Sequence, residues 1–117
     1  MTKFLSDKHH ERFEKLVDKA NNTESLEKLS LLYIIAGNDH LYRNSENIYN
    51  FAKETINKDT LENDIYSQSE SDLLRLGFTL FNGFRNRITI NDVFYSLAGD
   101  SAVLAINAIK FRHQIKG

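Results

Sequence analysis

The sequence predicts an all-α fold: a single compact domain of five or six packed helices with short loops, over residues 1–117. Three observations predict it. The 117 residues include no proline, the residue that interrupts helices most strongly. Apolar residues recur at helical spacing in almost every segment. With 41% hydrophobic and 26% charged residues, the chain can fill a core and solvate its surface without metal or disulfide support.

The first part of the chain predicts an amphipathic helix followed by a buried one. Ser6 is expected to cap the first helix and Asn21-Asn22 to end it. The inward stripe at i, i+3, i+4 and i+7 consists of Phe13, Leu16, Val17 and Ala20. Thr23 is expected to cap the second helix, which is apolar on every side over residues 31–36. That pattern is typical of a helix surrounded by neighbours, so this is the predicted central helix.

Gly37 is expected to end the central helix as a left-handed residue, and Asn38 or Asp39 to start a short turn. Ser45 is expected to cap a third helix. Its apolar side would carry Ile48, Phe51, Ala52 and Ile56. Residues 59–66 are compatible with one further short turn.

A strong helix, apolar on two faces, is predicted from Ser69 or Ser71, with Gly83 as its terminator. The alternating serines around its start favour helix capping over catalysis. Residues 87–90 alternate like a strand, but no partner run is evident. A lone strand leaves its backbone groups unpaired, so no strand is expected there.

Two helices are predicted near the end of the chain. Asn91 or Asp92 should open a short helix ended by Gly99, and Asp100 or Ser101 should cap the last helix. A narrow stripe of mostly small residues on the last helix would let another helix approach closely. The stripe consists of Ala102, Ala105, Ile106 and Ile109.

Composition excludes several classes of function. The absence of cysteine excludes disulfides, thiolate zinc sites and iron–sulfur clusters. A formal charge of -1 provides no bulk attraction to nucleic acid or to an anionic membrane. The longest apolar run, residues 31–37, is far shorter than the roughly twenty residues of a membrane span. The first residues lack the apolar region of a signal peptide, so we expect a cytoplasmic protein that binds no membrane.

One concentrated polar cluster, residues 37–43, follows the predicted central helix and could line a cleft. Its Asp39 and His40 are of types that bind metals or shuttle protons, and His9 or His10 could add ligands if the first helix lay close. No metal-binding spacing occurs, and capping of a turn explains the polar residues more simply. We expect no metal and no cofactor. The candidate binding residues are Asn38, Asp39, His40, Tyr42, Arg43, Tyr49 and Asn82.

Charge and aromatic residues suggest interaction surfaces. The tyrosines are candidates for partial exposure: Tyr33, Tyr42, Tyr49, Tyr66 and Tyr95. A shared surface of Tyr42, Arg43 and Tyr49 would resemble a binding hot spot. An acidic segment carries Asp59, Glu62, Asp64, Glu70 and Asp72. A basic patch that could contact nucleic-acid phosphates comprises Arg85, Arg87, Lys110 and Arg112.

Five stretches carry a family resemblance that covers nearly the whole length. They are Phe4-Leu5-Ser6 with His9 and Arg12-Phe13, residues 32–42, residues 48–51, residues 76–83 and residues 105–112. In these stretches the chain resembles a small domain-of-unknown-function family of Gram-positive bacteria and their mobile elements. The resemblance implies a bacterial cytoplasmic protein and brings no activity or catalytic residue with it.

These observations favour a non-enzymatic helical protein-interaction module of the bacterial cytoplasm, an accessory or inhibitory factor of a mobile element. It would recognise a protein partner or form a homodimer. Two alternatives stay open: a weak nucleic-acid-binding protein using the basic C-terminal patch, and a small enzyme with a cleft near Asp39 and His40, where His40 would be the general base.

Overall fold

The computed structural model describes residues 3–81 and 89–115. Four long helices form the body of the fold: α1 (Asp7–Lys19), α2 (Leu26–Ala36), α5 (Gln68–Leu80) and α7 (Asp100–His113). Three are a single turn long: α3 (Asp39–Arg43), α4 (Ser45–Ile48) and α6 (Ile90–Phe94). A 3-10 helix, η1 (Lys58–Glu62), and two short strands complete the described part. The prediction of a single all-α domain is confirmed; the short turns bring the helices to seven among the described residues.

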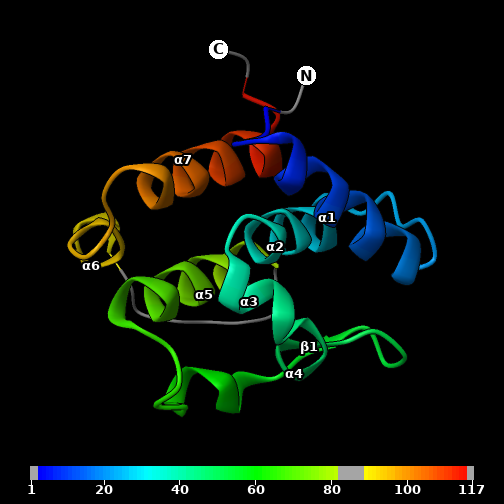
Figure 1. Cartoon of the computed structure of the whole chain (residues 1–117), viewed down its shortest axis with the longest axis horizontal. Helices are drawn as coiled ribbons and strands as arrows, with labels where there is room; N and C mark the ends of the chain where they lie inside the picture. The colour runs from blue at the N-terminus through cyan, green and yellow to red at the C-terminus, as the bar shows by residue number, and fades with distance from the viewer. Residues whose placement is uncertain (1–2, 82–88, 116–117) are drawn as a thin grey trace.

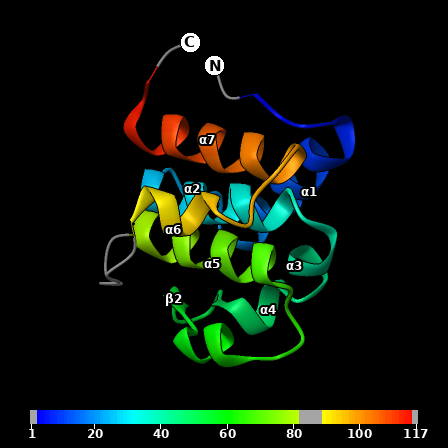
Figure 2. The ribbon, with the colours of Figure 1, turned by 90° about the vertical axis from the view of Figure 1, so that its left-hand side faces the viewer.

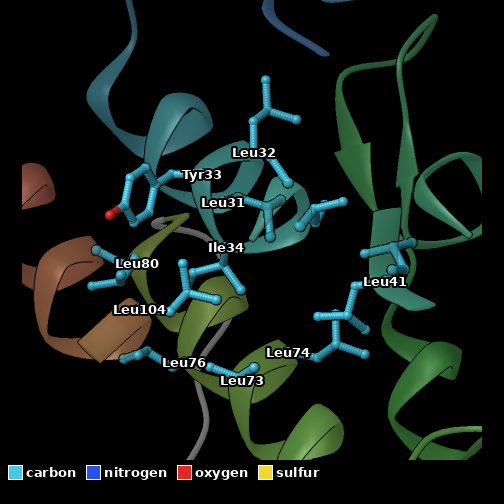
Figure 3. Packing of buried hydrophobic residues seen from close by; sticks show 14 of the residues in the cluster. Leu31, Leu32, Tyr33, Ile34, Leu41, Leu73, Leu74, Leu76, Leu80 and Leu104 are labelled. Atoms are coloured by element: carbon cyan, nitrogen blue, oxygen red, sulfur yellow. The ribbon is translucent and has the colours of Figure 1, made fainter. Parts of the chain in front are cut away.

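Helix α2 lies at the centre of the fold, as its sequence predicts. It contacts α1, α5 and α7, with α7 on one side and α5 on the other (Figures 1 and 2). Side chains 31–36 are at most 1% exposed. Figure 3 shows Leu31 and Ile34 of α2 among leucines of α5 and α7. Burial of the apolar surface of α2 against three helices therefore stabilises the domain.

Helix α1 follows the sequence-based prediction closely. The Ser6 side chain accepts a hydrogen bond from the backbone N–H of His9, which satisfies one of the free donors at the helix start. Phe13, Leu16 and Ala20 are buried. Asn21 and Asn22 both have left-handed backbone angles, φ 58° and 56°, and reverse the chain toward α2.

The predicted start of α2 needs correction, whereas its predicted end at Gly37 is right in position but not in conformation. Ser25, not Thr23, is the N-cap and accepts from Lys28 N–H, whereas the Thr23 hydroxyl accepts from Ser25 N–H. Gly37 is not left-handed, with φ -85° and ψ -2°. Its glycine is required by space, because an added Cβ would lie 2.3 Å from Leu104 Cδ1 of α7.

The predicted third helix is wrong beyond its first turn. Helix α4 ends at Ile48, and its N-cap is Asn44 rather than the predicted Ser45. Strand β1 (Tyr49–Asn50) pairs antiparallel with β2 (Thr55–Ile56). The Asn50 side chain accepts from Lys53 N–H at 2.8 Å and Glu54 is left-handed. Such local side-chain hydrogen bonding competes with the helix and favours a turn.

Helix α5 begins with a capping box at Ser67 and Glu70, so its N-cap lies two residues before Ser69, the earlier of the predicted serines. It ends at Leu80 with Phe81 as its C-cap. The predicted terminator Gly83 and the first half of the discounted strand, residues 87–88, lie outside the described residues.

The caps of the last two helices also differ from the predictions. Thr89, rather than Asn91 or Asp92, caps α6. Its hydroxyl accepts from Asp92 N–H, and the Asp92 carboxylate, at the third helical position, accepts from Thr89 N–H. Gly99, with φ 54°, occupies the N-cap of α7, so neither predicted residue caps this helix. The predicted small-residue stripe is divided: Ala105 is buried together with Leu104 and Ala108, whereas Ile106 is 45% exposed.

Candidate functional site

The polar cluster after α2 is organised around the turn into α3. The Asn38 side-chain oxygen accepts from Leu41 N–H at 3.0 Å, which confirms its predicted capping role. Leu41 is fully buried and anchors this turn in the core. Asn38 therefore uses its side-chain oxygen to start α3.

Asp39 lies in an ion-pair cluster that joins α1 to α3. Its two carboxylate oxygens contact Arg12 and Arg43, each at 2.6 Å. The Arg12 guanidinium also lies 4.7 Å from the ring centroid of Tyr42, a cation–π arrangement. The hydrogen bond from Arg12, supported by the charge of Arg43, lowers the pKa of the Asp39 carboxyl. The aspartate is thus held ionised by two arginines, one from each helix.

His40 has a different partner, on α5. Its Nδ1 lies 3.0 Å from Glu70 Oε1, and the same oxygen accepts from Ser67 N–H at 2.9 Å. The imidazole also contacts the ring of Tyr66, with centroids 5.2 Å apart. Burial raises the pKa of Glu70, but the hydrogen bonds from Ser67 and His40 outweigh it and lower the pKa overall. The Glu70 carboxylate orients His40 and caps α5 at once.

The two residues predicted to work together, Asp39 and His40, therefore engage different elements. His9 is 3% exposed and bonded to the Tyr33 carbonyl, and His10 pairs with Glu14 at 3.0 Å. Over residues 3–81 and 89–115, no three histidine, aspartate or glutamate side chains form a group that could hold a metal ion.

Tyr49 does not share a surface with Tyr42 and Arg43. It is 1% exposed, packs edge-on against Phe51 and Phe81, and its hydroxyl has no hydrogen-bond partner among the described residues. Burial raises the pKa of Tyr49.

Asn82, the remaining candidate binding residue, lies outside the described residues. The described residue before it, Phe81, follows Leu80 in the chain. The Leu80 carbonyl accepts a hydrogen bond from Arg112, and Arg112 also contacts Glu27 in the first turn of α2. That is the end of α2 opposite Asn38.

The basic patch is reduced to two described residues, because Arg85 and Arg87 lie outside them. Arg112 points inward: its Nε donates to the Leu80 carbonyl at 3.0 Å, and its NH2 lies 3.4 Å from Glu27. This side chain joins α7 to the end of α5 and the start of α2. Lys110 lies two residues before Arg112, in the last part of α7.

The acidic segment also divides in the structure. Asp59, Glu62 and Asp64 are exposed on and after η1, whereas Glu70 pairs with His40. Asp72 is buried and accepts from the Ser96 hydroxyl at 2.6 Å, which ties α5 to the segment after α6.

Exposure of the tyrosines was predicted correctly for only part of the set. Tyr33, Tyr49 and Tyr66 are buried, Tyr42 is half-buried, and Tyr95 is 93% exposed. Ile90, at the start of α6, is 75% exposed, which periodicity did not predict. The sequence signal for Ile90 is its place directly after the capping threonine, where a first-turn side chain need not face the core. Helix α6 thus has a solvent-exposed apolar residue at each end.

These features define a small all-α protein in which the polar side chains singled out from the sequence mostly hold helices to one another. The family described as "Family of unknown function (DUF6075)" matches residues 1–116. The chain belongs to this family. Comparison with curated proteins and with solved structures gave no match. No helix in the described part of the chain is both long and apolar enough to span a membrane.

Proposed function

We propose that the protein is a non-enzymatic interaction module that recognises a protein partner through Ile90 and Tyr95, the α6 contact residues. The observation that carries the proposal is the 93% exposure of Tyr95 and the 75% exposure of Ile90, at the two ends of α6. Tyrosine is enriched at protein interfaces, since its ring gives a large contact area and its hydroxyl a polar end. Burying both side chains on a partner would recover apolar surface that folding leaves in water.

The way in which α6 is held against the fold supports the proposal. Helix α6 contacts α5, and Val93, between the two exposed residues, is 3% exposed. Thr89 and Asp92 form a capping box that orders the start of the helix. A contact helix fixed in this way loses little conformational entropy on binding, which favours affinity.

The polar candidates are a weaker basis for a binding site. Asp39 is paired with two arginines, and Arg112 donates into the fold. A ligand that recruited them would have to replace interactions that join helices. As part of the proposal, the module acts in the bacterial cytoplasm as an accessory or inhibitory factor of a mobile element.

A photocrosslinking experiment tests the proposal. A photoreactive amino acid at position 95 should label a discrete protein in a Gram-positive lysate, and the same label at the exposed position 62 should not. Unlabelled wild-type protein should compete, whereas the Ile90→Ser, Tyr95→Ser double variant should not. Equal labelling from both positions, or equal competition by the double variant, contradicts the proposal.

One observation favours the enzymatic alternative. His40 is oriented by Glu70 at 3.0 Å and is still 32% exposed, so a proton on Nδ1 would leave Nε2 available as a base. In this alternative His40 acts on a small molecule bound beside α3. Saturable binding of a compound from a metabolite library, lost in His40→Gln but not in His10→Gln, would favour it over the interaction module.

A further inference from the structure

Residues 3–5 form an N-terminal strap that is tied to α1 and α2 by two hydrogen bonds. The Tyr33 hydroxyl of α2 donates to the Lys3 carbonyl. The Leu5 N–H donates to Nδ1 of His9 in α1 at 3.0 Å. Nε2 of the same imidazole lies 2.9 Å from the Tyr33 carbonyl oxygen. His9 therefore contacts the strap with one ring nitrogen and the central helix with the other.

The ring of Phe4, between these two hydrogen bonds, rests on aromatic side chains of both helices. It stacks on His10, with centroids 4.2 Å apart and an angle of 13° between the planes. It also contacts Phe13 and Tyr33, at 5.5 Å and 5.8 Å between centroids, and packs edge-on against His9 at 5.2 Å. The strap therefore covers aromatic surface that its release would expose to water.

The two hydrogen bonds of His9 respond differently to protonation. A backbone N–H can only donate, so the bond from Leu5 requires an unprotonated Nδ1. Nε2 carries a proton both in the neutral tautomer that this bond selects and in the imidazolium ion. A proton on Nδ1 therefore sets two donors against each other at Leu5, whereas Nε2 still donates to the Tyr33 carbonyl.

We propose that protonation of His9 releases the strap while α1 and α2 stay packed together. The packing of the two helices does not depend on the bond from Leu5, because the buried side chains of α1 face α2. The Ser6 hydroxyl still accepts from His9 N–H and caps α1. Acid therefore detaches the strap selectively and uncovers the aromatic surface on which Phe4 rests.

The charged and titratable groups around His9 come from the strap and both helices. Lys3 of the strap is exposed, and His10 of α1 pairs with Glu14 at 3.0 Å. On α2 the Tyr33 phenol stays protonated, because burial raises its pKa. Helix α7 meets Tyr33 through two uncharged side chains, the ring of Phe111 and the hydrogen-bonding Asn107.

These surroundings set the direction of the response to pH. Burial lowers the pKa of His9 by more than the Tyr33 carbonyl raises it, and the charge of His10 adds to the lowering. Release of the strap removes part of this burial, so the pKa returns toward its ordinary value of 6.5. Below 6.5 the ratio of released to closed strap should therefore rise, by up to about tenfold per pH unit.

Amide exchange measured by NMR on the full chain, from pH 7.5 to pH 5.0, tests the release. The protection factor of Leu5 should fall by up to about tenfold per pH unit below 6.5. At each pH it should not change with urea at low concentration, because a local opening exposes little surface, whereas protection in residues 31–36 should decrease with urea. A Leu5 protection factor that falls with urea as steeply as the core, or that ignores pH, overturns the inference.

Two substitutions separate the nitrogens of His9. Asparagine places its amide oxygen where Nδ1 lies, so His9→Asn should keep Leu5 protected at every pH. Glutamine places its amide nitrogen near Nε2 and offers Leu5 no acceptor, so His9→Gln should leave the strap released even at pH 7.5. The same pH response in His9→Asn as in wild type contradicts the proposal. The urea dependence of the wild-type chain decides the question even if that variant does not fold.

His10→Gln is the matched control for the neighbouring histidine. His10 stacks on Phe4, and a cation over an aromatic ring is attracted to it, so protonation of His10 holds the strap in place. The variant should therefore keep the acid release of Leu5. Loss of the pH response in His10→Gln would assign the release to His10 and overturn the role of His9.

Discussion

His9 Nε2 lies 2.9 Å from the carbonyl oxygen of Tyr33, and His9 Nδ1 accepts from Leu5 N–H at 3.0 Å. An acceptor Nδ1 requires the neutral tautomer with its proton on Nε2, so Nε2 donates to the carbonyl. The side chain is 3% exposed, and burial lowers its pKa despite the carbonyl. A neutral histidine therefore ties α1 and the chain before it to the central helix.

Stability should fall as the pH drops below 6.5. Above that value both states hold a neutral His9; below it the unfolded chain binds a proton that the folded chain excludes, because the folded pKa is lower. The free energy of unfolding should decrease by up to about 1.4 kcal/mol per pH unit until the folded pKa is reached. Urea denaturation at pH 7.5, 6.5 and 5.5 measures this change in the free energy of unfolding.

His9→Gln is the control for this effect. The variant should lose roughly 1–3 kcal/mol at pH 7.5, because a buried hydrogen-bonding arrangement is disturbed, but its stability should vary less with pH. The other three histidines and the Glu70 carboxylate are retained in the variant. An unchanged pH slope in His9→Gln would assign the effect to those groups instead.

Gly37→Ala should destabilise the domain by about 1–3 kcal/mol through overpacking. The backbone angles of Gly37 suit alanine, so the cost arises from the clash with Leu104. A double-mutant cycle with Leu104→Ala, followed by thermal or urea unfolding, measures the coupling. The substitution should cost much less in the Leu104→Ala background; equal costs in both backgrounds would show that the close approach is not the cause.

Ser67→Ala should cost about 1 kcal/mol, because it removes one half of the capping box at the start of α5. Ser71→Ala is the matched control within the helix, where alanine is the better helix former, and should stay within about 0.5 kcal/mol of wild type. Chemical denaturation of the two variants compares them directly. A larger loss for Ser71→Ala would mean that a different serine governs this helix start.

Arg112→Ala should lower stability by roughly 1–2 kcal/mol, because the guanidinium donates to the Leu80 carbonyl at the end of α5 and pairs with Glu27. Lys110→Ala is the companion variant on the same helix end. Unfolding curves are measured together with titration of labelled DNA and RNA at low salt. Unaltered stability combined with lost nucleic-acid binding would favour the alternative in which Arg112 contacts phosphates.

Much of the helical architecture could be predicted from the sequence, because it follows from local pattern. The all-round apolar run at residues 31–36 identified the central helix, and Ser6 and Asn38 were correct caps. The failure at residues 45–56 has a local cause as well. The apolar spacing there fits a helix, but hydrogen bonding by the Asn50 side chain and the left-handed Glu54 favour a hairpin.

The candidate site was less predictable, since side-chain partners come from distant positions. Asp39 and His40 are neighbours in the chain, yet one pairs with Arg12 and the other with Glu70. Adjacent helical side chains point about 100° apart, so adjacency alone could not bring them to one site. Tyr49 resembled an exposed aromatic, but the hairpin places it in the core.

The sequence by itself determined the fold class, the central helix and the caps at Ser6 and Asn38, because propensity, capping and apolar period act over a few residues. Only the tertiary structure decided that His9 is a buried neutral link, that Gly37 makes room for Leu104, and that Tyr95 and Val103 face solvent. Each depends on which helix packs against which. That choice is set by the summed burial of surfaces far apart in the chain, and no local pattern encodes it.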